Sequence, residues 1–172
     1  PGHYCTPGSS FERVCPLGTF CPAGSTVPSI CPLGSYAPPD RGNSSRFSLG
    51  GACVTCPAGS FQELVGNSTC VPCTPGHYCA EGSAAPLPCP GGKHKDPSLE
   101  VMTSVEQCIS CPAGTSCAVG SDEPSDCLPG TYGAEAEQHT CASCPAGSYT
   151  SEPGATVCLT CVAGYLCVEG AS

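Results

Sequence analysis

The sequence predicts a small disulfide-rich fold: a mostly irregular chain with short β-hairpins, forming an elongated rod of tandem units with one disulfide bond each. Three observations predict it. Cysteine provides 19 of the 172 residues, beside 22 glycines and 20 prolines, which is typical of disulfide scaffolds. Leu, Ile, Val and Phe make up only 15% of the chain, too little for an ordinary core. Every cysteine is followed three residues later by Gly or Cys.

The cysteines define a repeat that opens with Cys-x-x-Gly-x-aromatic, as in residues 15–20 and 144–149. Two insertions, between Cys31 and Cys53 and between Cys89 and Cys108, interrupt a period of 16–17 residues. We therefore expect residues 1–172 to be one array of tandem repeats, and a slice of a longer one. The units open at Cys15, Cys31, Cys56, Cys73, Cys89, Cys111, Cys127, Cys144 and Cys161.

Each recurring residue type in the opening motif has an expected physical role. The glycine suits a turn that needs a positive φ angle, with proline presetting the position before it. The aromatic residue two positions later is expected to lie over a disulfide bond and to shield it. Small clusters of this kind, each touching its neighbours, would behave as a quasi-one-dimensional rod.

Spacing favours sequential disulfide bonds, in which each opening cysteine pairs with the next cysteine. This scheme gives one bond per unit and leaves Cys5 to pair with an upstream cysteine, expected two residues before Pro1. The alternative joins cysteines one-to-three and two-to-four, for example Cys53–Cys70 with Cys56–Cys73. The sequential pairs are Cys15–Cys21, Cys31–Cys53, Cys56–Cys70, Cys73–Cys79, Cys89–Cys108, Cys111–Cys117, Cys127–Cys141, Cys144–Cys158 and Cys161–Cys167.

Zinc binding is the competing use of these cysteines. The spacings over residues 53–73 and 141–161 come close to those of zinc ribbons. The closely spaced cysteine triplets that begin at Cys15, Cys73 and Cys111 do not suit tetrahedral sites, so we expect disulfides and no cofactor.

Charge and hydropathy exclude several partners. Fourteen acidic residues outnumber five basic ones, for a net charge of −9. Binding to nucleic acid or to anionic lipid needs clustered Lys and Arg, so neither is expected. No apolar run approaches the length of a membrane-spanning helix, and this segment should not insert into a membrane. The cysteines place the chain in the secretory pathway, outside the cell or at its surface.

Both asparagines of the chain lie in acceptor sequons, Asn43-Ser-Ser and Asn67-Ser-Thr. We expect N-linked glycans at Asn43 and Asn67, since sequons in surface turns of secreted proteins are glycosylated.

The sequence contains no recognisable catalytic motif, so we expect no enzyme. His3, His77 and His94 lie at or beside the aromatic position of the repeat and should serve packing, whereas His139 should lie in a solvated loop. Residues 96–105 offer one helix candidate, capped by Asp96, but an irregular loop is favoured there.

The opening motif and the closing Cys-x-x-Cys resemble the ephrin-receptor-like cysteine-rich repeats. The 13-residue loops also look like one-disulfide modules of tumour-necrosis-factor receptors, which implies sequential closure there. The ephrin-receptor-like family occurs in large extracellular proteins, including algal mastigoneme (ciliary hair) proteins and protist surface proteins. The resemblance thus implies a rod or fibre component without catalytic residues.

These observations favour a non-enzymatic structural glycoprotein segment that forms an extracellular stalk or filament. Its partners would be neighbouring repeats of the same long protein and copies of itself in a fibre. The alternative is a ligand-binding cysteine-rich ectodomain of a cell-surface receptor. Its protein ligand would then contact the insertions, residues 37–52 and 93–107.

Overall fold

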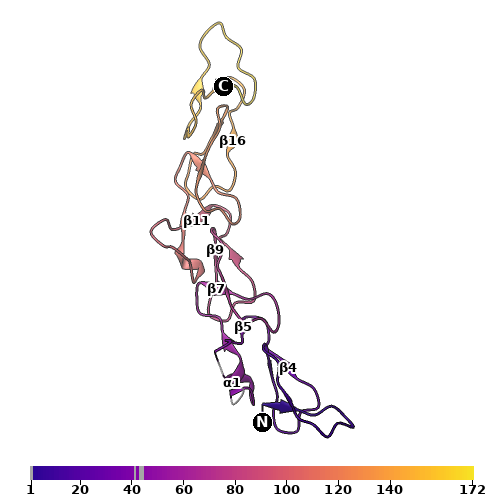
Figure 1. Cartoon of the computed structure of the whole chain (residues 1–172). Coiled ribbons are helices and arrows are strands. Elements are labelled where there is room, and N and C mark those ends of the chain that lie inside the picture. The colour runs from indigo at the N-terminus through magenta and orange to yellow at the C-terminus, as the bar shows by residue number, and fades with distance from the viewer. Residues whose placement is uncertain (1, 41, 43–44) are drawn as a thin grey trace. The chain divides into compact units, whose positions relative to one another are not determined.

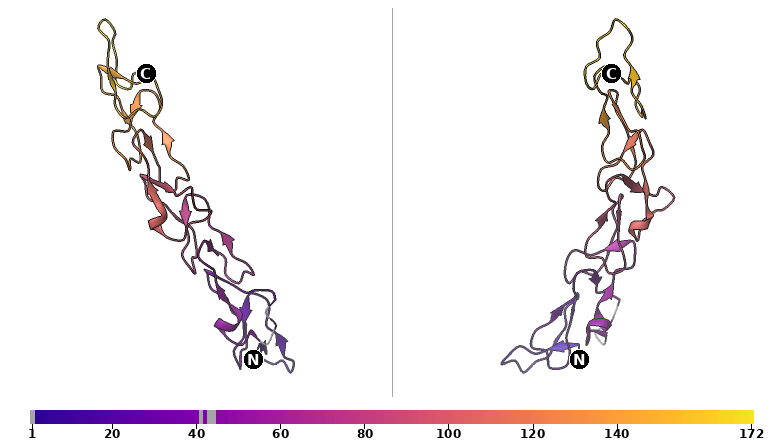
Figure 2. Two further views of the ribbon diagram at one scale, coloured as in Figure 1. Left: turned by 90° about the vertical axis from the view of Figure 1, so that its left-hand side faces the viewer. Right: turned by 180° about the vertical axis from the view of Figure 1, so that it is seen from behind.

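The computed structural model describes residues 2–40, 42 and 45–172. Contacts between Cα atoms divide the chain into two compact parts. The N-terminal part comprises Pro1–Cys73 and Cys79–Pro86, and the C-terminal part comprises Thr74–Tyr78 and Leu87–Ser172. In each part taken by itself, the hairpins follow one another in chain order (Figures 1 and 2).

Regular structure in the described residues consists almost entirely of two-stranded antiparallel hairpins, with strands of two or three residues. The N-terminal part contains β1 (His3–Tyr4) with β2 (Arg13–Val14), β3 (Thr19–Phe20) with β4 (Ser29–Ile30), β5 (Ser35–Tyr36) with β6 (Val54–Thr55), and β7 (Ser60–Phe61) with β8 (Val71–Pro72). The C-terminal part contains β9 (His77–Tyr78) with β10 (Leu87–Pro88), β11 (Lys93–Lys95) with β12 (Cys108–Ser110), β13 (Thr115–Ser116) with β14 (Ser125–Asp126), β15 (Thr131–Tyr132) with β16 (Ala142–Ser143), and β17 (Ser148–Tyr149) with β18 (Leu159–Thr160). The predicted fold class, an irregular chain of short hairpins and tandem disulfide units, is confirmed.

The Cys-x-x-Gly turn starts each described hairpin after the first. In the Cys15 unit, Gly18 has a φ of 80°, and the Thr19 N–H donates to the Pro16 carbonyl at 3.2 Å. The Thr19 hydroxyl donates to the same carbonyl at 2.7 Å. Proline thus occupies the first position of this turn, whereas in the Cys73 unit Pro75 directly precedes the glycine. The hydroxyl after the glycine is part of the turn, a role that the sequence analysis missed.

In the described residues of the insertions, two short helices occur: α1 (Leu49–Ala52) and the 3₁₀-helix η2 (Val105–Gln107). The longer helix considered for residues 96–105 does not form, and the favoured irregular loop is observed. The Asp96 carboxylate accepts hydrogen bonds from the Ser98 N–H at 2.9 Å and the Ser98 hydroxyl at 2.7 Å. This local turn competes with a helix start. Within the described residues, no helix combines the length and apolar character needed to cross a bilayer.

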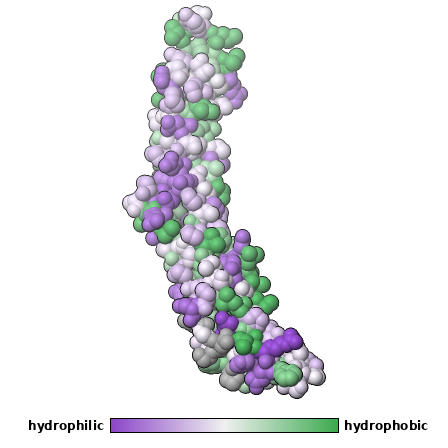
Figure 3. Space-filling model, in the orientation of Figure 1, coloured by the Kyte–Doolittle hydropathy of each residue, from purple (hydrophilic) through white to green (hydrophobic). Residues whose placement is uncertain are grey.

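The buried residues are mostly cysteines, gathered in small separate clusters. Many larger apolar side chains stay exposed, among them Phe11 at 78% and Leu128 at 71%. In the space-filling view, apolar groups alternate with polar ones over the visible surface of both parts (Figure 3). The disulfides and their immediate neighbours therefore replace a continuous core.

Candidate functional site: the junction between repeat units

The structure joins 18 of the 19 cysteines in nine disulfide bonds, and these are the sequential pairs. None of the crossed pairs occurs among the described residues. Both zinc-ribbon spacings consist entirely of disulfide-bonded cysteines, which leaves no thiolate there to bind zinc. The described residues also hold no group of three or more potential metal ligands.

Cys5, Asn43 and Asn67 are the predicted site residues outside the nine disulfide bonds. Cys5 is exposed and has no disulfide partner among the described residues, so its upstream partner stays a prediction. Asn43 lies outside the described residues. Asn67 is half-buried; its side-chain oxygen accepts from the Ser68 N–H at 2.8 Å, and its carbonyl accepts from the Ala37 N–H at 2.9 Å. Glycosylation of both asparagines stays a prediction.

Backbone hydrogen bonds connect each unit to the next in the same way. The N–H of each of the nine opening cysteines donates to the carbonyl of the motif glycine in the preceding unit, at 2.9–3.0 Å. In return, the carbonyl of an opening cysteine accepts a hydrogen bond from a turn later in the following unit, called here the second turn. The Gly66 N–H donates to the Cys31 carbonyl at 2.9 Å, and the Gly82 N–H donates to the Cys56 carbonyl at 2.8 Å. The same bond occurs at the carbonyls of Cys89, Cys111, Cys127 and Cys144.

A further contact reaches the unit after next. The motif glycine Gly34 has a φ of 71°, and a Cβ atom added there would lie 2.0 Å from the carbonyl oxygen of Gly82. Gly82 belongs to the Cys73 unit, two units beyond that of Gly34. Corresponding approaches of 1.9–2.3 Å occur at Gly18, Gly76, Gly92, Gly114 and Gly130. A side chain at these positions would therefore push the units apart.

The aromatic residue of one unit packs on the disulfide of the following unit. Phe61 forms a buried cluster with Cys73 and Cys79. Phe20 packs against the cluster around Cys31–Cys53, and Tyr78 against the cluster around Cys89–Cys108. The ring thus shields a disulfide, as expected, and that disulfide lies in the neighbouring unit.

Both insertions supply buried side chains to such clusters. In the first insertion, Ala37 and Ala52 are 3% and 1% exposed and pack with Cys31 and Cys53. In the second, Met102 is 1% exposed and packs with Cys89 and Cys108. The insertions therefore contribute to the local fold besides adding surface.

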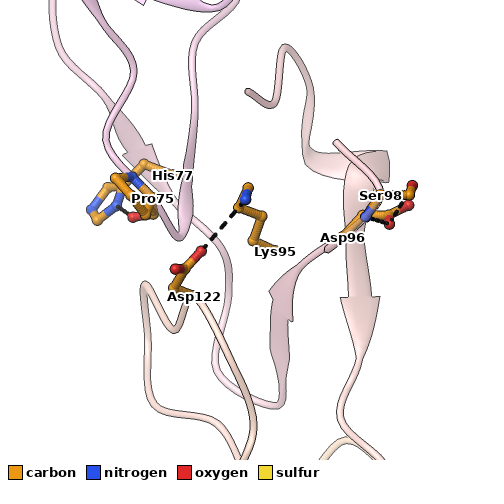
Figure 4. Close-up of polar contacts among 6 residues, drawn as sticks. All are labelled: Pro75, His77, Lys95, Asp96, Ser98 and Asp122. Carbon is orange, nitrogen blue, oxygen red and sulfur yellow. Dashed lines mark hydrogen bonds and ion pairs between the residues drawn. The ribbon is translucent and has the colours of Figure 1, made fainter. Parts of the chain in front are cut away.

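The histidines and charged groups show no catalytic arrangement in the described residues. His94 is only 7% exposed, which fits a packing role, although its Nδ1 atom has no hydrogen-bond partner there. The His77 Nδ1 atom lies 2.9 Å from the Pro75 carbonyl, and Lys95 pairs with Asp122 of the following unit at 3.9 Å (Figure 4). His139 is exposed, as expected.

Asp96 in the C-terminal part is hydrogen-bonded to Ser98 (Figure 4). Hydrogen bonds from the side chain and then the backbone of Ser98 lower the pKa of this exposed carboxyl. Its small contribution to stability is thus present above the unfolded pKa and is lost as the pH falls through the folded pKa. This carboxylate maintains a turn.

Residues 114–161 match the family model described as tyrosine-protein kinase ephrin type A/B receptor-like. This segment therefore carries an ephrin-receptor-like cysteine-rich repeat, and the resemblance is confirmed for these residues. The family is a receptor-like cysteine-rich module, not an enzyme domain. Together with the many disulfide bonds of this chain, the match suggests an extracellular domain. A search of curated proteins finds no match to the chain.

The second turn has one exception that sequence reasoning overlooked. Glu137 has a φ of 64°, the only positive φ at a non-glycine residue among those described. It stands where other units place Gly66, Gly82, Gly120, Gly154 or Gly170, each donating to the preceding opening carbonyl as Glu137 does. The sequence offered a signal, because the other five units have a glycine at this turn.

We predict that Glu137→Gly stabilises the C-terminal part by about 1 kcal/mol, because a left-handed conformation costs roughly 1–2 kcal/mol for an L-residue. Glu137 also accepts a hydrogen bond from the Ser110 hydroxyl, which offsets part of this gain. Urea unfolding of the disulfide-intact protein measures the change. The control is Glu135→Gly, two residues away and exposed, which should bring no gain. A loss of stability in Glu137→Gly would contradict the equivalence of these turns.

Proposed function

We propose that the chain is a structural, glycosylated segment of an extracellular stalk or filament, whose units act as stiff spacers. The observation that supports this most is the junction: the same backbone bond from an opening cysteine to the preceding glycine recurs at all nine openings. Contacts to the next unit and to the unit after it oppose bending between units. Sequential disulfide pairing and N-glycans at Asn43 and Asn67 are part of the proposal.

An in-phase deletion tests the spacer role. Removing residues 127–160 takes out two whole units with their Cys127–Cys141 and Cys144–Cys158 bonds and places Cys161 directly after Asp126. The deletion removes about one fifth of the chain. For a stiff rod, the radius of gyration should fall by about 20%, whereas compact-domain scaling gives only about 8%.

Small-angle X-ray scattering of the disulfide-intact proteins measures this change. Deglycosylation of both samples with a peptide N-glycosidase removes the glycan contribution and, by the mass lost, reports the occupancy of Asn43 and Asn67. A fall of 8% or less in the radius of gyration would contradict the spacer role.

A receptor ectodomain is the second candidate, favoured by the exposed apolar side chains of the two insertions. Phe47 and Leu49 are 49% and 48% exposed, and Val101 and Val105 are 39% and 40% exposed. Replacing these four residues with serine leaves the buried Ala52 and Met102 in place. A spacer keeps its radius of gyration in this variant, whereas a receptor no longer binds its soluble ligand.

A further inference from the structure

In the Cys111 unit of the C-terminal part, no Phe or Tyr stands at the aromatic position to pack on the following disulfide. Ser116 occupies the aromatic position of the Cys111 unit, and the disulfide of the following unit is Cys127–Cys141. An open hollow of about 440 Å³ lies there, lined by residues that include Ser116, Asp126, Leu128, His139 and Cys141. About 150 Å³ is enough to hold a benzene ring. The hollow therefore has room for the ring that Ser116 does not provide.

Two other units also have no Phe or Tyr at this position, but each supplies another ring. His94 fills its place with its own buried imidazole, 7% exposed. Leu166 follows Tyr165, and both side chains line a hollow in the last unit. The Ser116 hollow has no Phe or Tyr ring in its lining, and its one imidazole belongs to His139, an exposed side chain.

Three aromatic residues lie outside the aromatic position: Phe11, Phe47 and Tyr165. Phe11 is 78% exposed, in the hairpin loop between β1 and β2. The Ser9 hydroxyl accepts from the Phe11 N–H and donates to the Phe11 carbonyl, both at 3.2 Å. These bonds order the backbone at Phe11, which lowers part of the entropy cost of binding.

Charge selects Phe11 over the other two rings. Arg13, two residues away, is exposed, and the nearer Glu12 lies 4.0 Å from His3. The hollow contains Asp126 and belongs to a part with ten acidic and two basic residues, against four and three in the other part. Tyr165 is followed by Glu169 and has no basic residue within the last unit. Arg46 beside Phe47 already donates to the Cys15 carbonyl at 2.8 Å.

We propose that the Ser116 hollow binds Phe11 of a second copy of this chain, with Arg13 of that copy facing Asp126. This inference rests on the proposed function and names the partner for filament growth. The two surfaces differ and lie in different parts of the chain, so the contact is heterologous. Such a contact repeats into an open filament when it does not close into a ring.

Sedimentation equilibrium of the full disulfide-intact chain over a concentration series tests the proposal. The wild type should self-associate, and Phe11→Ser should raise the dissociation constant roughly tenfold or more, because a buried aromatic anchor dominates such contacts. Ser116→Phe fills the hollow from within and should weaken association to the same extent. If Ser116→Phe does not fold, Leu128→Asp at the rim, 71% exposed in the free chain, carries the same expectation.

Matched controls separate this contact from general stickiness. Tyr165→Ser removes an equally exposed ring, 79% exposed, and should change the dissociation constant less than about twofold. Arg13→Glu and Asp126→Arg should each weaken association, and their combination should restore it.

Three outcomes would overturn the proposal: a monomeric wild type at all concentrations, an equal loss in Tyr165→Ser, or no recovery in the charge-reversed pair. Any of these leaves the spacer role intact, because the scattering experiment on the deletion measures that role in the monomer.

Discussion

Gly34→Ala will destabilise the N-terminal part by about 3 kcal/mol or more. Two effects add at this position. The φ of 71° is unfavourable for any residue with a Cβ atom, and that atom would lie 2.0 Å from the Gly82 carbonyl oxygen. The oxygen belongs to the backbone, so it cannot rotate away. The units must shift apart, and this shift weakens the hydrogen bond from the Gly82 N–H to the Cys56 carbonyl.

Gly24→Ala is the matched control. Gly24 stands in the same Cys-Pro-x-Gly-Ser context as Gly34 and has a φ of 83°, but a Cβ atom there would meet nothing within 4 Å. Only the conformational cost remains, about 1–2 kcal/mol. Urea unfolding under non-reducing conditions compares the two variants. Equal losses would mean that the contact to the unit after next contributes nothing.

Phe61→Ala will cost about 3 kcal/mol, at the lower end of the range for a buried phenylalanine. Phe61 is 7% exposed and packs on Cys73 and Cys79 of the following unit. Because Cys79 is fully buried, loss of the ring should also open this disulfide to reductant. Thermal unfolding measures the first effect, and timed alkylation after mild reduction, read out by peptide mass, measures the second.

Phe11→Ala serves as the control, since Phe11 is 78% exposed. At protein concentrations where the chain is monomeric, its stability should change by less than about 0.5 kcal/mol. The rate of reduction at Cys73–Cys79 should stay at the wild-type value. A Phe61→Ala variant that behaves like Phe11→Ala would show that the aromatic position does not couple neighbouring units.

The sequence was enough to predict the elements that depend on local chemistry. Glycine three residues after cysteine indicates a turn with positive φ, and Gly18 and Gly34 adopt it. A sparse apolar content predicts short hairpins held by disulfides, as observed. The ring over a disulfide was also expected, because few other apolar groups exist to cover the sulfur atoms.

The contacts between units could not be predicted in the same way. A period of 16–17 residues says that units repeat, but not that Phe61 covers a bond of the following unit or that Gly34 meets Gly82 two units on. Those relations depend on the path of the chain in three dimensions. The candidate helix of residues 96–105 did not form for a related reason. Met102 packs in the Cys89–Cys108 cluster, and Asp96 forms a turn with Ser98.

Disulfide bonds take the place of a hydrophobic core in this protein. Hydrogen exchange of the backbone amides, measured before and after full reduction and alkylation of the cysteines, tests this role of the disulfides most directly. We predict that the opening cysteine N–H groups, protected in the oxidised protein by their bonds to the preceding glycine carbonyls, exchange at the rates of an unfolded chain once reduced. Protection that persists in the alkylated protein would contradict the claim.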